Sequence, residues 1–81
     1  MATLMSAEGA QTVGVWPGAL KPGDLVARFG WLHEVASVET RWFYFQDASR
    51  TVEGAVVTFT SGEEYRGYEW STVQRVEDRP L

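Results

Sequence analysis

The sequence predicts an all-β fold, a small antiparallel barrel of five to six strands with one 3₁₀ turn. Apolar and polar side chains alternate over short stretches, β-branched and aromatic residues are frequent, and turn residues recur at close intervals. Aromatic residues make up 14% of the 81 positions, and no heptad or long amphipathic helix is apparent. Short strands at such spacing are typical of small barrels and half-barrels.

Residues 1–15 are small and polar, with Glu8 as their one charged side chain, so we expect a flexible N-terminal tail. Trp16-Pro17-Gly18 is a turn signal, and Lys21-Pro22-Gly23-Asp24 is a stronger one, because proline fixes φ and glycine accepts positive φ. A strand at Leu25–Phe29 should follow directly.

Trp31 to Glu39 predicts a second strand, in which imperfect alternation indicates a bulge or a strong twist. Glu39-Thr40-Arg41 is interpreted as a short hairpin connection. Trp42 to Asp47 then forms a third strand, with Phe43 and Phe45 on one side and Trp42 and Tyr44 on the other. Both faces of that strand are apolar, so each must be covered or remain exposed.

The C-terminal half continues the pattern of short strands. The expected elements are a loop at 48–53, a strand at 54–60, a turn at 61–62, a strand at 63–70, a one-turn helix from Ser71-Thr72 and a last strand at 74–76. The domain should therefore span residues 16–78, followed by a C-terminal tail at 79–81.

Composition limits the classes of function. The formal net charge is −4, and the basic residues are scattered, which disfavours nucleic-acid binding by the chain alone. Cysteine is absent, so no disulfide and no thiolate metal site can form. No stretch reaches the roughly 20 apolar residues of a membrane span, and the first residues do not resemble a secretory signal. We expect a cytoplasmic protein without membrane contact.

Four short motifs together resemble a Src-homology-3-like small barrel of the Tudor or KOW type. The motifs are Gly23-Asp24-Leu25-Val26-Ala27, then Trp31 with Glu34-Val35 and Val38, then Val57-Thr58-Phe59-Thr60-Ser61-Gly62-Glu63, and finally Ser71-Thr72-Val73-Gln74-Arg75-Val76. The resemblance covers residues 20–76. It implies a binding module, whose function differs among members of that family.

Two groups of aromatic residues are candidate binding sites. Phe29, Trp31, Tyr44 and Tyr65, with Glu63 or Glu64 nearby, could form a cage for a methylated ammonium group; the alternative is ordinary packing. Trp42, Tyr44, Tyr68 and Trp70, with Arg41 and Arg66 beside them, could form an exposed face that binds a partner; the alternative is that residues 13–20 cover it.

Catalytic chemistry is not indicated. His33 is the one histidine, and no nucleophile and carboxylate are placed to form a triad with it. Glu63 and Glu64 are adjacent, so in a strand they point to opposite faces and cannot share a proton. No catalytic residue, metal ligand or cofactor is therefore predicted.

The leading hypothesis is a non-enzymatic interaction module that binds a protein partner, or itself, through the aromatic face. Two alternatives stay open. One is a nucleic-acid-associated module that uses Arg28, Arg41, Arg50 and Arg66 with stacked aromatic residues, which requires the arginines to lie on one face. The other is a small acidic inhibitor of a nucleic-acid-handling enzyme, which requires Glu63, Glu64, Glu69 and Glu77 to lie along one surface.

Overall fold

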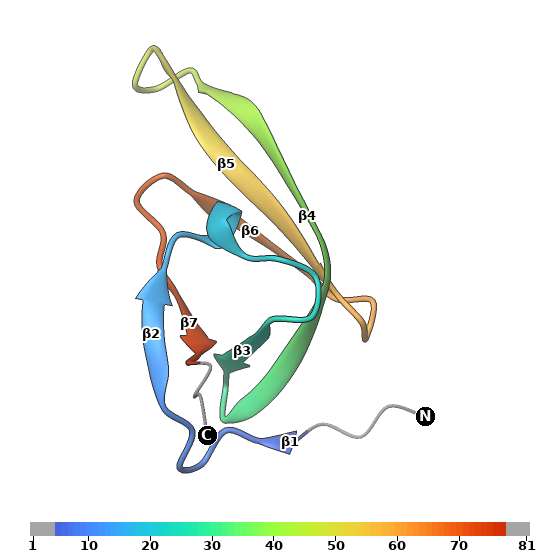
Figure 1. Cartoon of the computed structure of the whole chain (residues 1–81). Helices are drawn as coiled ribbons and strands as arrows, with labels where there is room; N and C mark the ends of the chain where they lie inside the picture. Colours follow the sequence, from blue (N-terminus) through green and yellow to red (C-terminus); the bar gives the residue numbers. More distant parts are fainter. Residues whose placement is uncertain (1–4, 78–81) are drawn as a thin grey trace.

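The structure, a computed structural model, describes residues 5–77 and is all-β, as predicted. Its strands are β1 (Met5–Ser6), β2 (Thr12–Val15), β3 (Leu25–Arg28), β4 (Trp31–Phe45), β5 (Arg50–Phe59), β6 (Glu64–Tyr68) and β7 (Val73–Val76), and Pro17–Ala19 form a 3₁₀ helix, η1. The antiparallel sheet has the order β2-β7-β3-β4-β5-β6, and β1 pairs with the start of β4 (Figure 1). Residues 5–77 thus form seven strands rather than five to six, and their sheet is curled but not closed (Figure 1).

The N-terminal segment differs from the expected tail. Within residues 1–15, β2 pairs with β7 from Thr12↔Val76 to Val15↔Val73, and β1 pairs with β4. Most side chains here are exposed, so these strands are held by backbone pairing with distant segments. For this reason the sequences of β1 and β2 do not show the alternation of apolar and polar residues that would predict a strand. Residues 1–4 and 78–81, including the expected C-terminal tail at 79–81, lie outside the described residues.

The predicted hairpin at Glu39-Thr40-Arg41 is wrong, because β4 continues through it. Its pairing with β5 is unbroken from Val38↔Val57 to Phe45↔Arg50. The segment contains no glycine, proline or asparagine that would favour a tight turn, and the chain reverses instead at residues 46–49. The predicted irregularity in β4 is confirmed, since the register shifts between Val35 and Ser37.

The bulge shapes the core. One extra residue between Val35 and Val38 lets both side chains face inward, although their spacing in a regular strand would separate them. The buried cluster comprises Leu20, Val26, Val35, Val57, Phe59 and Val73, with Val15, Val38 and Tyr65 packed against it. This cluster lies inside the curl of the sheet.

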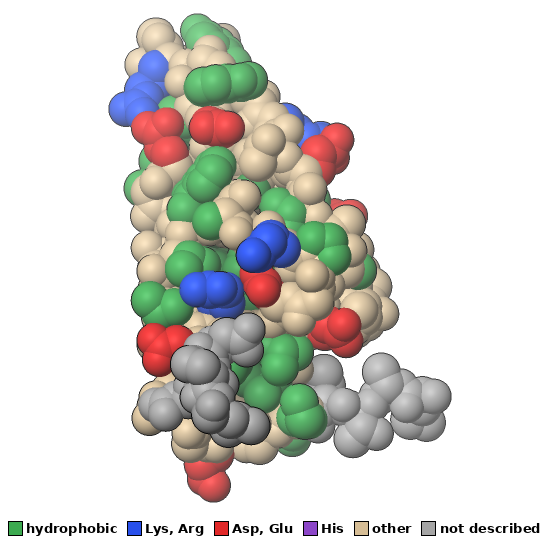
Figure 2. All heavy atoms as spheres, viewed as in Figure 1, with side chains coloured by type: hydrophobic (Ala, Val, Ile, Leu, Met, Phe, Trp, Pro, Cys, Tyr) green, Lys and Arg blue, Asp and Glu red, His purple; other side chains and the backbone are tan. Residues whose placement is uncertain are grey.

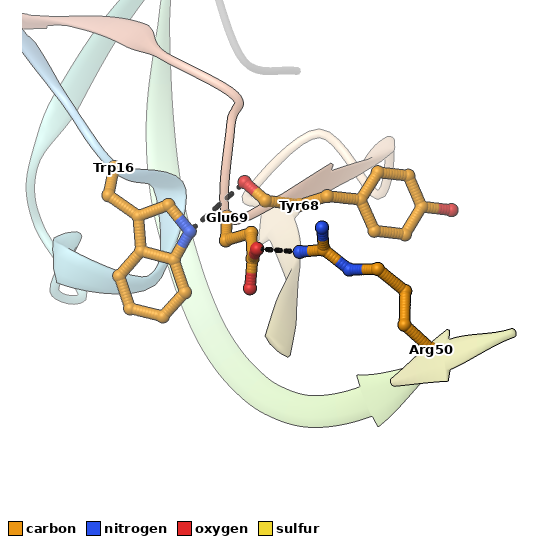
Figure 3. A network of polar contacts seen from close by, with 4 residues as sticks. All are labelled: Trp16, Arg50, Tyr68 and Glu69. Carbon is orange, nitrogen blue, oxygen red and sulfur yellow. Dashed lines mark hydrogen bonds and ion pairs between the residues drawn. The ribbon is translucent and has the colours of Figure 1, made fainter. Parts of the chain in front are cut away.

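The segment around η1 bridges the open side of the sheet. Trp16 donates a 3.1 Å hydrogen bond from Nε1 to the carbonyl oxygen of Tyr68 at the end of β6 (Figure 3). Pro17 is buried beside Gly67, where a Cβ atom would come within 2.6 Å of the proline ring. The 3₁₀ helix therefore lies before β3. At the position predicted for it, Ser71 instead closes a single turn onto Tyr68.

His33 is a buried polar residue of this core. It is 7% exposed, its ring centroid lies 5.3 Å from that of Phe59, and neither ring nitrogen has a hydrogen-bond partner among residues 5–77. A buried polar group without a partner reduces stability by about 1–3 kcal/mol.

We therefore expect His33→Leu to raise the free energy of unfolding by about 1 kcal/mol. Urea denaturation of the variant and the wild type, followed by circular dichroism, measures the difference. Substitution of the exposed neighbour, Glu34→Leu, serves as a control and should not reproduce the gain. A less stable His33→Leu variant would mean that the imidazole is satisfied.

Candidate functional site

Beyond the core, strands β4 and β5 extend as a two-stranded arm, defined here as residues 42–53. Sheet pairing of β5 with β6 stops at Gly54↔Tyr68, so within the described chain the strand residues of the arm pair only with each other. Figure 1 shows the arm projecting away from the rest of the sheet. Figure 2 shows apolar side chains at its surface, with basic and acidic side chains between them.

The register of the arm gives each face its own set of side chains. Directly opposite residues of an antiparallel pair point to the same face. The face that continues from the core, called the inner face, carries Trp42, Tyr44, Thr51 and Glu53, and the opposite face, called the outer face, carries Phe43, Phe45, Arg50 and Val52. The predicted separation of Phe43 and Phe45 from Trp42 and Tyr44 is confirmed.

The outer face holds a packed aromatic cluster, consisting of Phe43, Phe45, Tyr68 and Trp70. The Tyr68 ring meets Phe43 and Phe45 edge-on, at centroid distances of 5.4 and 5.1 Å, and stacks on Trp70 at 5.2 Å. These are favourable geometries for aromatic pairs. Val52 lies within this face and is only 1% exposed.

Charged groups and an open depression border the cluster. Arg66 lies over the Phe43 ring, with its guanidinium carbon 5.2 Å from the centroid. Arg50 forms an ion pair with Glu69, on the side of β6 where the Tyr68 ring points (Figure 3). Next to that pair is a mainly apolar depression of about 240 Å³, lined by Phe45, Asp47, Ala48, Arg50, Val52 and Trp70.

The inner face of the arm carries two large exposed rings. Trp42 is 67% and Tyr44 66% exposed. Trp16 belongs to residues 13–20, which the alternative interpretation placed over the aromatic face, and it is hydrogen bonded to β6 at Tyr68. Trp70, a member of the outer cluster, is similarly exposed at 62%.

The structure divides the six residues predicted to bind a partner between the two faces. Trp42 and Tyr44 are on the inner face, whereas Arg41, Arg66 and Tyr68 are on the outer face. Trp70, in the turn after β6, stacks on Tyr68. The division arises because Tyr68 lies opposite Gly54, which in turn lies opposite Arg41. Phe43, Phe45 and Val52 belong to the outer cluster but were not predicted as site residues. In the sequence, the alternation of Phe43 and Phe45 with Trp42 and Tyr44 could have identified the two phenylalanines as site residues.

Three of the four residues of the predicted cage, Phe29, Trp31 and Tyr65, lie outside the arm and around Arg28. Phe29 and Tyr65 have their ring centroids 5.0 and 4.9 Å from the guanidinium carbon of Arg28, and Phe59 lies at 5.6 Å. Trp31 pairs directly with Arg28. A cation of the protein itself is therefore held among these rings, and Tyr44 lies in the distant arm.

Two further observations concern the described chain as a whole. Residues 5–77 contain no cluster of three or more histidine, aspartate or glutamate side chains suited to hold a metal ion. Across the same residues, no helix has the length and apolar character needed to cross a bilayer.

Comparisons with known proteins complete the description of the site. The chain matches no protein-family model, no curated protein and no solved structure. Its function must therefore be inferred from its own residues.

Proposed function

We propose that the protein is a non-enzymatic interaction module, a partly open relative of the Src-homology-3-like small barrels, and that it binds a protein partner through its arm. The observation that carries this proposal is the exposure of three large rings, Trp42, Tyr44 and Trp70, on or beside one two-stranded extension. A large aromatic side chain can bury roughly 150–250 Å², and each Å² of apolar surface removed from water contributes about 25 cal/mol of free energy. Trp, Tyr and Arg are also the residues that most often dominate binding energy at interfaces.

The outer face is the more complete binding surface. Its apolar depression can accept an aliphatic or aromatic side chain against Phe45, Val52 and Trp70. Arg50 and Asp47 at the edge provide charges that can orient the backbone of an extended peptide. A fixed apolar centre within a polar rim is the usual organisation of a protein-binding site. The packing around Tyr68 fixes the cluster before a partner arrives, which lowers the entropic cost of binding.

Peptide selection tests this proposal. A displayed library of random peptides is selected on the folded chain, and binding of the selected peptides is measured by calorimetry. We expect peptides with an apolar anchor residue, and Trp70→Ala should weaken their binding about tenfold or more, since an anchor contact contributes 1–2 kcal/mol. Trp31→Ala, which removes an exposed tryptophan outside the arm, is the matched control and should leave the affinity unchanged. Failure to select any peptide, or equal binding by both variants, would contradict the proposal.

One observation favours the nucleic-acid alternative. Arg41, Arg50 and Arg66 share the outer face with the aromatic cluster, whereas Arg28 is held in the core-side ring cluster. Arg41 and Arg50 are each paired with a glutamate, Glu39 and Glu69, and the net charge is −4. Protein binding therefore remains the better-supported function. Salt-dependent binding of single-stranded RNA would favour the alternative.

The inhibitor hypothesis has less support. Glu64 begins β6, Glu69 follows its end and is engaged by Arg50, and Glu77 follows β7. Strands β6 and β7 are not neighbours in the sheet, so these acidic groups do not follow one pair of adjacent strands.

A further inference from the structure

Strand β4 has a long unpaired edge. Residues Ser37–Phe45 pair with β5 on one side, while β3 and β1 pair only with the first part of β4, up to Glu34. Among the described residues, no strand covers the other edge of Ser37–Phe45. Such an edge presents free backbone N–H and C=O groups. Proteins commonly protect an edge with charged side chains, especially lysine, or with proline; this segment has no lysine or proline, and its two charges, Glu39 and Arg41, are of opposite sign.

From this edge we infer that the chain forms a symmetric dimer in which β4 pairs antiparallel with β4 of a second copy, with the two-fold axis at Thr40. Antiparallel addition across a two-fold axis joins two sheets into one and satisfies both edges. The inference rests on the proposed function, because it names the partner that contacts the inner face of the arm.

Charge complementarity selects the register. Directly opposite residues of an antiparallel pair point to the same face. A two-fold axis perpendicular to the sheet must therefore place one residue of β4 directly opposite the same residue of the second copy. With the axis at Thr40, Glu39 of each copy lies opposite Arg41 of the other copy. Both charges are already on the outer face and pair with each other within one chain. On dimerisation, Glu39 and Arg41 of one chain would each replace their ion pair with each other by an ion pair with the second chain.

Neighbouring registers lack this complementarity. An axis at Glu39 places the two Glu39 carboxylates opposite each other, and an axis at Arg41 does the same for the two guanidinium groups. An axis at Trp42 places Glu39 opposite the apolar Phe45. Like charges directly opposite in a sheet are destabilising, so the register at Thr40 is the favoured one of these four.

The same register covers apolar surface on the inner face. Val38 of one copy lies opposite Trp42 of the other, on the side where Trp42 is exposed. Val38 is partly buried against the core, so the indole would extend the core of the second molecule. An aromatic and a β-branched residue directly opposite each other form a favourable cross-strand pair. The self-pairing thus accounts for the exposure of Trp42, whereas the outer depression stays free for another partner.

Charge reversal tests the dimer and its register together. Sedimentation equilibrium over a dilution series should show a dimer for the wild type. Glu39→Arg and Arg41→Glu each place like charges opposite each other, and each should raise the dissociation constant about tenfold or more. The double variant Glu39→Arg/Arg41→Glu restores opposite charges and should restore the dimer. Mixing the two single variants should give a heterodimer. Circular dichroism confirms that each variant is folded.

Each other outcome has a defined meaning. A wild type that is monomeric over the whole series overturns the inference, as does a dimer that survives both single reversals or is not restored in the double variant. Peptide binding that still depends on Trp70 in a monomeric protein would leave the proposed function intact while the self-pairing fails. If instead the chain dimerises but does not bind the peptides, the proposed function fails while the self-pairing stands.

Discussion

Phe59→Ala is expected to leave most of the protein unfolded at room temperature. Phe59 is 2% exposed and is the largest fully buried side chain of the core. It lies in β5 opposite Val35, its ring meets His33, and the Arg28 guanidinium lies 5.6 Å from its centroid. Truncation of a buried phenylalanine costs about 3–5 kcal/mol. A single core in a chain of this size provides about that much net stability.

Urea titration followed by near-ultraviolet circular dichroism measures this effect. The variant should lack the native aromatic signal even without denaturant. Phe59→Leu keeps most of the apolar volume and should stay folded with a smaller loss. A Phe59→Ala variant that remains native with a loss below about 1 kcal/mol would show that the core can collapse around the cavity.

Gly54→Ala is expected to lower the free energy of unfolding by about 2–3 kcal/mol, near the upper end of the range for overpacking. A Cβ atom at Gly54 would lie 2.7 Å from the Phe43 ring and 2.8 Å from the carbonyl oxygen of Gly67. The ring can rotate, but the carbonyl belongs to the backbone of β6, so strands β5 and β6 would have to separate. The substitution therefore acts on the outer cluster as well as on stability.

Thr51→Ala provides the control for this prediction. Thr51 lies on the same strand with an exposed side chain, and its substitution should change stability by less than about 0.5 kcal/mol. In Gly54→Ala, we also expect weaker binding of outer-face peptides, because Phe43 supports Tyr68 in the cluster. Unchanged stability together with an unchanged aromatic circular dichroism signal would contradict the steric argument.

Local patterns predicted the elements that depend on local causes. The turn at Lys21-Pro22-Gly23-Asp24 and the strand after it agree with the structure, and so does the irregularity that the structure places between Val35 and Ser37. The hairpin at Glu39-Thr40-Arg41 failed because three polar residues are equally compatible with a strand exposed to solvent. A tight turn needs residues with suitable backbone conformations, such as glycine, proline or asparagine, and polar side chains alone do not provide this.

Features set by distant partners were less accessible. Strand β2 is held by its pairing with β7, far along the chain. The side chains of β2 are mostly exposed, so its sequence gives little indication of that pairing. The alternation of residues 42–45 correctly separated two aromatic pairs, yet it could not show which pair shares a face with Tyr68. That depends on the register of β6 against β5, which is fixed where Gly54 lies opposite Tyr68. The position of Arg28 likewise depends on Phe59 and Tyr65, two rings that lie far along the chain from it.

The link between Trp16 and Tyr68 joins the two ends of the sheet through a side chain. Neighbouring strands of the sheet are joined by backbone ladders, but the open side between β2 and β6 is spanned by one indole hydrogen bond and by the contact of Pro17 with Gly67. One such bond contributes about 1 kcal/mol, so the seam is held mainly by the apolar packing beside it, in which Leu20 and Val73 are buried. The two ends of the sheet are therefore held together by side chains, in contrast to the backbone pairing that joins its neighbouring strands.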